Sequence, residues 1–173
     1  VNPELLTQQR HQVRTLLAFV RPFYSDWDDQ YCDELVKRFN IDPAERISAL
    51  SFGTRVKLNL VMALAHRPAL LLLDEPLAGL DAVSRHEIFT EILSAVQDEN
   101  RSALISSHDL HDLERITDHI GFINDGRMIL EGPTGDIVGR FRMIDAATAN
   151  GTRPEQLPGA RLISRDGPRC RFL

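Results

Sequence analysis

The sequence LLLLDEPLAGLD, from Leu70 to Asp81, carries the strongest structural signal in the chain. A short apolar run ends in two adjacent carboxylates, Asp74 and Glu75, and Pro76 follows them. Because proline has no amide hydrogen to donate to a neighbouring strand, it ends the strand. An all-apolar run of this length between such breakers predicts a buried central strand of a parallel sheet.

The two carboxylates stand at the carboxyl end of a predicted strand, where open α/β sheets bind their ligands. Neighbouring residues of a strand point to opposite sides, so Asp74 and Glu75 suit different tasks if the strand continues through them. One acid then holds a metal ion and the other faces a water molecule. Taken alone, the same residues also fit a plain strand end followed by a turn, so other motifs must decide.

A serine and a glycine stand at the start of a predicted helix within ISALSFGTRVK, residues 47–57. The free amides and the positive end of the helix dipole attract phosphate at such a position, and Gly53 lets the backbone come close to it. An ordinary helix N-cap at Ser51 explains the same pattern.

A histidine follows the next predicted strand, which includes Ala103, Leu104 and Ile105. If this strand runs parallel to the one that ends at Asp74, His108 points at the same crevice. Taken alone, such a histidine is more often a surface residue or a helix cap.

The run from Leu70 to Asp81 resembles the Walker B motif and the D-loop of ABC-type ATPases. By this resemblance, Asp74 holds Mg²⁺ and Glu75 is the general base that polarises the attacking water. Asp81 belongs to the D-loop, which crosses to a partner subunit. His108 resembles the H-loop histidine, which contacts the γ-phosphate of ATP and helps to hold the water.

The sequence LSFGT, residues 50–54, resembles the ABC signature, whose usual form is LSGGQ. It lies at the family's usual distance before the Walker B acids. Phe52 and Thr54 replace the first glycine and the glutamine of that form. In the family this loop contacts the ATP held by the opposite subunit, so the resemblance makes Ser51 and Gly53 the expected nucleotide contacts.

A phosphate-binding P-loop needs the pattern Gly-x-x-x-x-Gly-Lys-Ser/Thr. The chain has only two lysines, Lys37 and Lys57, and each follows a valine. This Walker A motif is therefore missing, and the resemblance covers roughly Leu16 to Asp136, the latter two-thirds of an ABC ATPase domain. We expect the chain, which starts at Val1, to be truncated at its N-terminus and not to bind or hydrolyse ATP by itself.

These motifs predict an α/β fold, a P-loop NTPase-like partial parallel sheet with a small helical subdomain. We expect residues 1–68 to form the helical subdomain, which ends in the signature motif and its helix. Residues 69–139 would form the Walker B, D-loop and H-loop part of the ATPase core. Residues 140–173 form an Arg-rich extension. Hairpins are predicted over Asp125-Gly126 and over Asp166-Gly167.

In the helical subdomain, a first helix should end before Pro22. A second helix should begin after an N-cap at Ser25 or Asp26 and end at Asn40. Its aromatic residues favour core packing, and the alternative is a groove for a membrane partner. The stretch FVRPFYSDWDDQY, residues 19–31, resembles the ATPases of type-two ABC exporters most.

Composition sets further expectations about partners and location. The net charge of −5 argues against a nucleic-acid partner. The two cysteines, Cys32 and Cys170, lack the CxxC spacing and should be free thiols in a reducing compartment. The apolar runs are much shorter than the roughly 20 residues of a membrane helix, so membrane association requires a partner.

The resemblance implies an enzyme that converts ATP and water to ADP and phosphate, with ATP and Mg²⁺ bound. It implies a second ABC ATPase subunit, in a homo- or heterodimer, and an integral-membrane permease. The protein would be cytoplasmic and peripheral to the inner face of the cell membrane. Two alternatives stay open: a soluble non-transport ABC ATPase, and a non-enzymatic remnant that lends Ser51 and Gly53 to a partner. The sequence does not identify the transported substrate or the direction of transport.

Overall fold

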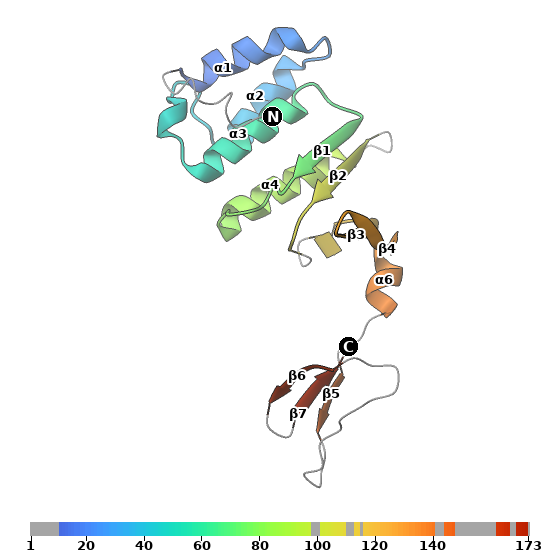
Figure 1. Ribbon diagram of the computed structural model, residues 1–173. Coiled ribbons are helices and arrows are strands. Elements are labelled where there is room, and N and C mark those ends of the chain that lie inside the picture. The colour runs from blue at the N-terminus through green and yellow to red at the C-terminus, as the bar shows by residue number, and fades with distance from the viewer. Residues whose placement is uncertain are drawn as a thin grey trace. The chain divides into compact units, whose positions relative to one another are not determined.

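The computed structural model divides the chain into two compact units, Val1–His108 and Asp109–Leu173. We describe each unit by itself (Figure 1). The domain boundaries expected after residues 68 and 139 stay predictions. The structure describes residues 11–97, 101–109, 113–114, 116–140, 144–147, 162–166 and 169–172.

The first unit combines helices with a pair of parallel strands. Its helices are α1 (Val13–Val20), the 3-10 helix η2 (Arg21–Phe23), α2 (Asp29–Arg38), the 3-10 helix η3 (Ile47–Ala49), α3 (Phe52–Leu64) and α4 (Ala82–Ala95). Its strands are β1 (Leu70–Asp74) and β2 (Ser102–Ser106).

The start of α2 corrects a prediction from the sequence. The N-cap is Asp28, not Ser25 or Asp26, and its carboxylate accepts the amide of Tyr31 at 2.9 Å. The other carboxylate oxygen accepts a hydrogen bond from Arg67 at 2.7 Å. Asp28 therefore satisfies a helix amide and a distant arginine together, and this tertiary contact is invisible in a local capping pattern.

The predicted end of α2 at Asn40 is confirmed. Asn40 adopts a left-handed backbone with φ of 51°. Its amide donates to the carbonyl of Lys37, and the amide of Ile41 donates to the carbonyl of Val36, both at 3.0 Å. This pair of bonds is a Schellman motif, which satisfies the last carbonyls of the helix.

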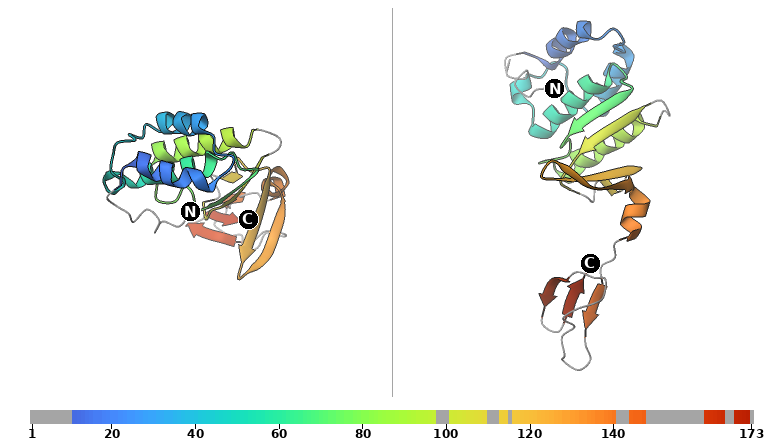
Figure 2. Two further views of the ribbon diagram at one scale, coloured as in Figure 1. Left: turned by 90° about the horizontal axis from the view of Figure 1, so that it is seen from above. Right: turned by 45° about the vertical axis from the view of Figure 1, so that its right-hand side comes forward.

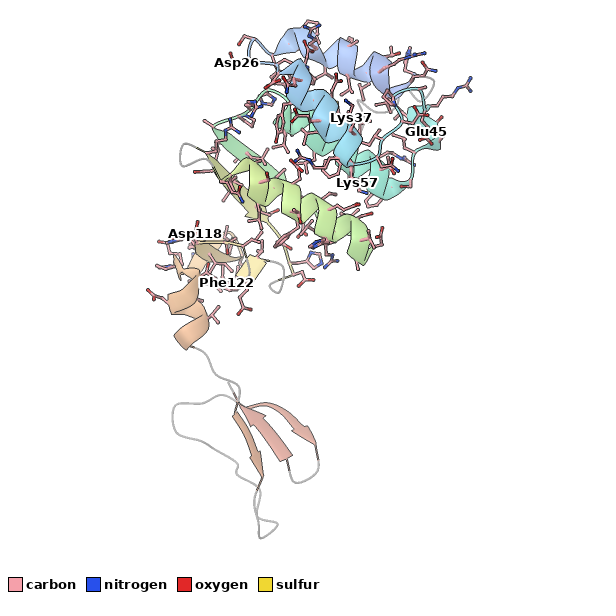
Figure 3. All side chains as sticks on the ribbon, turned by 180° about the vertical axis from the view of Figure 1, so that it is seen from behind. Asp26, Lys37, Glu45, Lys57, Asp118 and Phe122 are labelled. Carbon is pink, nitrogen blue, oxygen red and sulfur yellow. The ribbon has the colours of Figure 1, made fainter. Side chains whose placement is uncertain are left out.

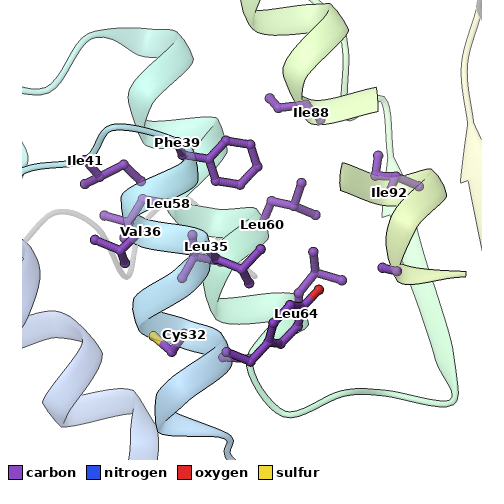
Figure 4. Packing of buried hydrophobic residues seen from close by; sticks show 14 of the residues in the cluster. Cys32, Leu35, Val36, Phe39, Ile41, Leu58, Leu60, Leu64, Ile88 and Ile92 are labelled. Carbon is purple, nitrogen blue, oxygen red and sulfur yellow. The ribbon is translucent and has the colours of Figure 1, made fainter. Parts of the chain in front are cut away.

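The core of the first unit lies between α2, α3 and α4 and against one face of the strands. Leu35 on α2, Leu58 on α3 and Ile88 on α4 are almost fully buried in it (Figure 4). The aromatic side chain of Tyr31 also belongs to this core, which confirms core packing for part of the aromatic set. The helical layer and the strands thus form one packed body.

Strands β1 and β2 are parallel, as predicted, and pair in register from Leu70↔Ser102 to Asp74↔Ser106. Helix α4 runs along one face of the pair (Figure 2). The expectation of a strand buried on both faces is wrong, because Leu72 and Leu104 on the other face are 66% and 67% exposed. Alternate residues of a strand point to opposite faces, and within the described residues only one face of this pair packs on the core.

The second unit contains β3 (His119–Asn124), β4 (Arg127–Pro133), α6 (Thr134–Arg140), β5 (Ile144–Ala147), β6 (Leu162–Asp166) and β7 (Arg169–Phe172). The hairpin of β3 and β4 over Asp125-Gly126 is confirmed, and both turn residues have positive φ. Its register shifts after Phe122, which is labelled in Figure 3.

The C-terminal extension forms a three-stranded antiparallel sheet in the order β5-β7-β6. The hairpin of β6 and β7 agrees with the prediction, whereas the sequence did not reveal β5. The sequence also predicts a helix from Leu110 to Thr117, and this segment lies partly outside the described residues. Among the helices that the structure describes, none is long and apolar enough to cross a membrane.

Candidate functional site

The carboxyl ends of β1 and β2 bring a carboxylate and a hydroxyl together. Asp74 and Ser106 are direct partners in the parallel register. The Ser106 hydroxyl donates a short hydrogen bond to Oδ1 of Asp74. The same hydroxyl oxygen accepts the backbone amide of Glu75 at 3.0 Å. Ser106 therefore orients both predicted acids from the neighbouring strand.

Glu75 does not continue the strand, so the predicted alternation of the two acids does not apply. Its φ is 45°, in the left-handed region that residues other than glycine seldom adopt. Its amide contacts the carbonyl oxygen of Ser106 at 3.2 Å as well as the hydroxyl. Unusual backbone of this kind costs about 1–3 kcal/mol and persists where surrounding bonds hold it, often at functional sites.

The backbone turn at Glu75 brings its side chain to His108. The Nδ1 atom of His108 lies 2.9 Å and 3.0 Å from the two carboxylate oxygens of Glu75. With its proton on Nδ1, the histidine donates to this carboxylate. The histidine side chain is 80% exposed, so this contact adds little to stability and serves to orient the glutamate.

The donor set at this edge fits Mg²⁺ in chemical type. Mg²⁺ prefers hard oxygen ligands, keeps several waters, and is held through one or two carboxylates together with substrate phosphates. Asp74 supplies such a carboxylate, and Ser106 fixes its orientation. Within the residues that the structure describes, no cluster of three or more His, Cys, Asp or Glu could hold a metal by itself.

The predicted signature residues stand at the start of α3. Ser51 is the N-cap of this helix, and its Oγ accepts the amide of Thr54 at 3.1 Å. The Ser51 and Thr54 hydroxyls also form a hydrogen bond of 2.8 Å. The capping interpretation of Ser51 is therefore confirmed, and a phosphate contact stays a prediction.

Asp81 has the same place on α4 that Ser51 has on α3. Its Oδ1 accepts the amides of Val83 at 3.0 Å and Ser84 at 2.9 Å, and its Oδ2 accepts the Ser84 hydroxyl at 2.8 Å. The Ser84 amide and hydroxyl hold the pKa of this carboxyl below its ordinary value. Asp81 thus caps α4 within its own chain.

The structure sorts the predicted residues into two groups. Asp74, Glu75 and His108 come together at the strand ends, and Ser51, Gly53 and Asp81 lie at the N-termini of two packed helices. Two serines that hold these groups, Ser106 and Ser84, were missed as site residues. The small hydroxyl residues after Ile105 were a visible signal for Ser106, but only the strand register shows which acid it contacts.

Comparison with known proteins supports the resemblance to ABC-type ATPases. A family model described as "ABC transporter" matches residues 2–78. The chain is 38% identical over 119 residues to the ABC transporter ATP-binding protein YtrB of Bacillus subtilis (strain 168). This alignment covers 69% of this chain and 41% of YtrB. The chain thus spans less than half the length of this relative.

Solved structures match as well. The structure of cbiO1 from Clostridium perfringens, described as part of the ABC transporter complex cbiONQ, aligns with a TM-score of 0.55 and 27% identity. The alignment covers 64% of this chain and 45% of cbiO1. An ATP-binding subunit of an ABC transporter aligns with a TM-score of 0.63 over 76% of this chain and 57% of that subunit. At 22% identity, this second match supports the fold alone.

Proposed function

Because this chain belongs to the ABC transporter family of ATP-binding proteins, we propose that it is the part of an ATP-hydrolysing subunit that carries the catalytic carboxylate and the signature loop. The complete subunit hydrolyses ATP to ADP and phosphate and thereby drives transport across a membrane through a permease. The relatives are described as ATP-binding proteins of transporters, which favours this function over a soluble non-transport ATPase.

The contact between Glu75 and His108 is the observation that carries the proposal. A general base must hold a carboxylate in a defined position beside the attacking water. His108 Nδ1 contacts both Glu75 oxygens, and the Glu75 amide is bound by Ser106, so the side chain and the backbone of the base are both held. Glu75 takes a proton from the water while the water attacks the γ-phosphate in line.

Asp74 holds the metal ion in this proposal. Mg²⁺, when bound, neutralises charge on the phosphates during the transfer. The Ser106 hydroxyl keeps the Asp74 carboxylate in one orientation before the metal arrives. Such a prepared geometry lowers the cost of positioning, which is the main source of catalysis in phosphoryl transfer.

Ser51, Gly53 and Asp81 face a second ATPase subunit, in a homo- or heterodimer, and close the nucleotide site of that subunit.

The open face of the β1–β2 pair, with Leu72 and Leu104 exposed, is consistent with a covering layer. Parallel sheets are normally covered on both faces. We assign this layer to the P-loop-bearing remainder of a complete subunit.

The complete subunit would lie at the inner face of the cell membrane, held there by an integral-membrane permease. Co-purification of a tagged complete subunit with a membrane-spanning protein tests this assignment. Recovery of the subunit alone from the soluble fraction, with full ATPase activity, would favour the soluble alternative.

The main experiment replaces Glu75 in a complete subunit, in which this chain is joined to a segment that carries Gly-x-x-x-x-Gly-Lys-Ser/Thr. Glu75→Gln should reduce ATP hydrolysis to background while ATP binding persists, because the amide cannot take the proton. Glu34→Gln is the matched control, since Glu34 is an exposed glutamate on α2. Unchanged turnover in Glu75→Gln would refute the general-base role.

A second measurement addresses the chain alone. Calorimetric titration of Mg-ATP into the 173-residue chain should give no heat of binding, because its sequence contains no P-loop. Binding in the micromolar range would mean that another site holds the phosphates, and the assignment of roles above would be wrong.

A further inference from the structure

The first turn of α3 packs closely against the first turn of α4. A Cβ atom placed on Gly53 would lie only 2.9 Å from Oγ of Ser84 and 3.4 Å from its Cβ. Ser84 is 9% exposed, so its side chain is enclosed at this contact. Residue 53 must therefore be glycine as long as the Ser84 hydroxyl keeps its position.

The Ser84 hydroxyl is held by the D-loop, residues 77–81. It donates to Oδ2 of Asp81 at 2.8 Å, while the Ser84 amide donates to Oδ1 at 2.9 Å. Rotating the hydroxyl away from Gly53 would break its bond to a carboxylate. Ser84 thus has the signature loop, residues 50–54, on one side and the D-loop on the other.

The same two loops also lie close together at Gly79 and Phe52. A Cβ atom on Gly79 would lie 3.5 Å from Cε1 of Phe52, one of the two residues that depart from the usual signature sequence. Gly79 has φ of 70°, a conformation that favours glycine. Further along the helices, Lys57 on α3 and Glu87 on α4 form an ion pair of 2.5 Å, which keeps the pair of helices aligned.

We propose that Ser84 is a positioning residue that holds the signature loop and the D-loop in one fixed arrangement, so that both loops meet the partner subunit's nucleotide together. This inference rests on the proposed ATPase function. It assigns Ser84 no contact with the nucleotide. Ser84 acts through Asp81 and Gly53, because its side chain lies between these two residues.

A thermal double-mutant cycle tests the contact in the full 173-residue chain. Gly53→Ala should lower the Tm, because the new methyl group collides with the Ser84 hydroxyl. In a Ser84→Ala background the hydroxyl is gone, and Gly53→Ala should leave the Tm unchanged or raise it, since alanine favours the helix. Gly135 is the matched control: it is the second residue of α6, as Gly53 is of α3, and its Cβ would meet open space.

A kinetic cycle in a complete subunit tests the positioning role. Ser84→Ala should lower kcat roughly ten-fold, the usual scale for one hydrogen bond to a charged group, with KM for ATP changed by less than about two-fold. The KM should persist because the P-loop, which Ser84 does not touch, holds most of the nucleotide. Gly53→Ala should lower kcat in both backgrounds, because Gly53 belongs to the signature loop. The loss should be smaller in the Ser84→Ala background, where no collision with the Ser84 hydroxyl adds to it.

The outcomes separate this inference from the proposed function. Independent effects on the Tm overturn the contact between Gly53 and Ser84. A coupled Tm with independent losses of kcat overturns the positioning role, since Gly53 would then act only through the nucleotide. Absence of hydrolysis by the unsubstituted complete subunit overturns the proposed function and the kinetic role together, and the Tm cycle still decides the contact.

Discussion

Replacing Arg38 on α2 should leave the buried carboxylate of Glu91 on α4 without its ion-pair partner. One guanidinium nitrogen of Arg38 lies 2.6 Å from both carboxylate oxygens of Glu91. The Glu91 side chain is 3% exposed, whereas that of Arg38 is 50% exposed. The hydrogen bond to Glu91 raises the pKa of Arg38 above its ordinary value. The pair is therefore buried on the glutamate side and open to water on the arginine side.

The size of the effect follows from this asymmetry. Removing one partner of a fully buried ion pair costs about 3–5 kcal/mol, because the other charge is left without compensation. Water can reach Glu91 through the space that Arg38 vacates, so we expect Arg38→Met to cost about 2–3 kcal/mol. Removing both charges, as in Arg38→Met with Glu91→Leu, should recover most of that loss, because no buried charge remains.

Urea unfolding of the full chain measures these changes. Trp27, the only tryptophan, packs against the core of the first unit, so its fluorescence reports on the unit that holds the pair. Arg14→Met is the matched control: Arg14 is an exposed arginine on α1 that contacts Gln12 at 2.7 Å, and its loss should cost less than about 0.5 kcal/mol.

Two results would refute this reasoning. A loss below about 1 kcal/mol in Arg38→Met would mean that Glu91 is solvated as an ordinary surface carboxylate. A double variant as unstable as Arg38→Met would mean that Arg38 stabilises the helices by the packing of its methylene groups and not by its charge.

Two further predictions concern titrating groups of the first unit. Burial raises the pKa of the Cys32 thiol from 9.0 to about 11. In a Cys170→Ser chain at pH 8, iodoacetamide should therefore react with Cys32 at least about 100-fold more slowly in the folded chain than after unfolding in urea. Equal reaction rates in the two states would contradict the burial of this thiol. The pKa of Asp81 is depressed in the folded state, so its contribution to stability is present above about pH 3.8 and is lost as the pH falls through the lower folded value. Asp81→Asn, which keeps an N-cap acceptor, should make the urea-unfolding free energy less dependent on pH below 4, and an unchanged pH dependence would show that the cap does not titrate with folding.

The site could be predicted from the sequence where the chemistry is local. The apolar run and Pro76 mark the end of β1, and the hydroxyl of Ser51 predicts the start of α3. The turn residues Asp125 and Gly126 mark the hairpin. Each of these signals acts within a few residues, because steric limits and capping bonds depend on neighbours along the chain.

Predictions failed where a distant residue decided the outcome. Asp28 caps α2 and not Ser25 or Asp26, because Arg67 binds the same carboxylate from the segment that follows α3. The left-handed backbone of Glu75 depends on Ser106, which reaches it only through the pairing of β1 and β2. The order of residues along the chain does not show which residues of two strands will pair.

The sequence alone thus determined which residue types are available for the chemistry: two acids after a strand, a histidine after the next strand, and a serine and a glycine at a helix start. Only the tertiary structure decided how they are held. The parallel register aligns Ser106 with Asp74, and the packing of α3 on α4 brings Ser84 against Gly53. Hydrogen bonds and close contacts depend on distances in space, and these arise when the chain buries its apolar residues in one core.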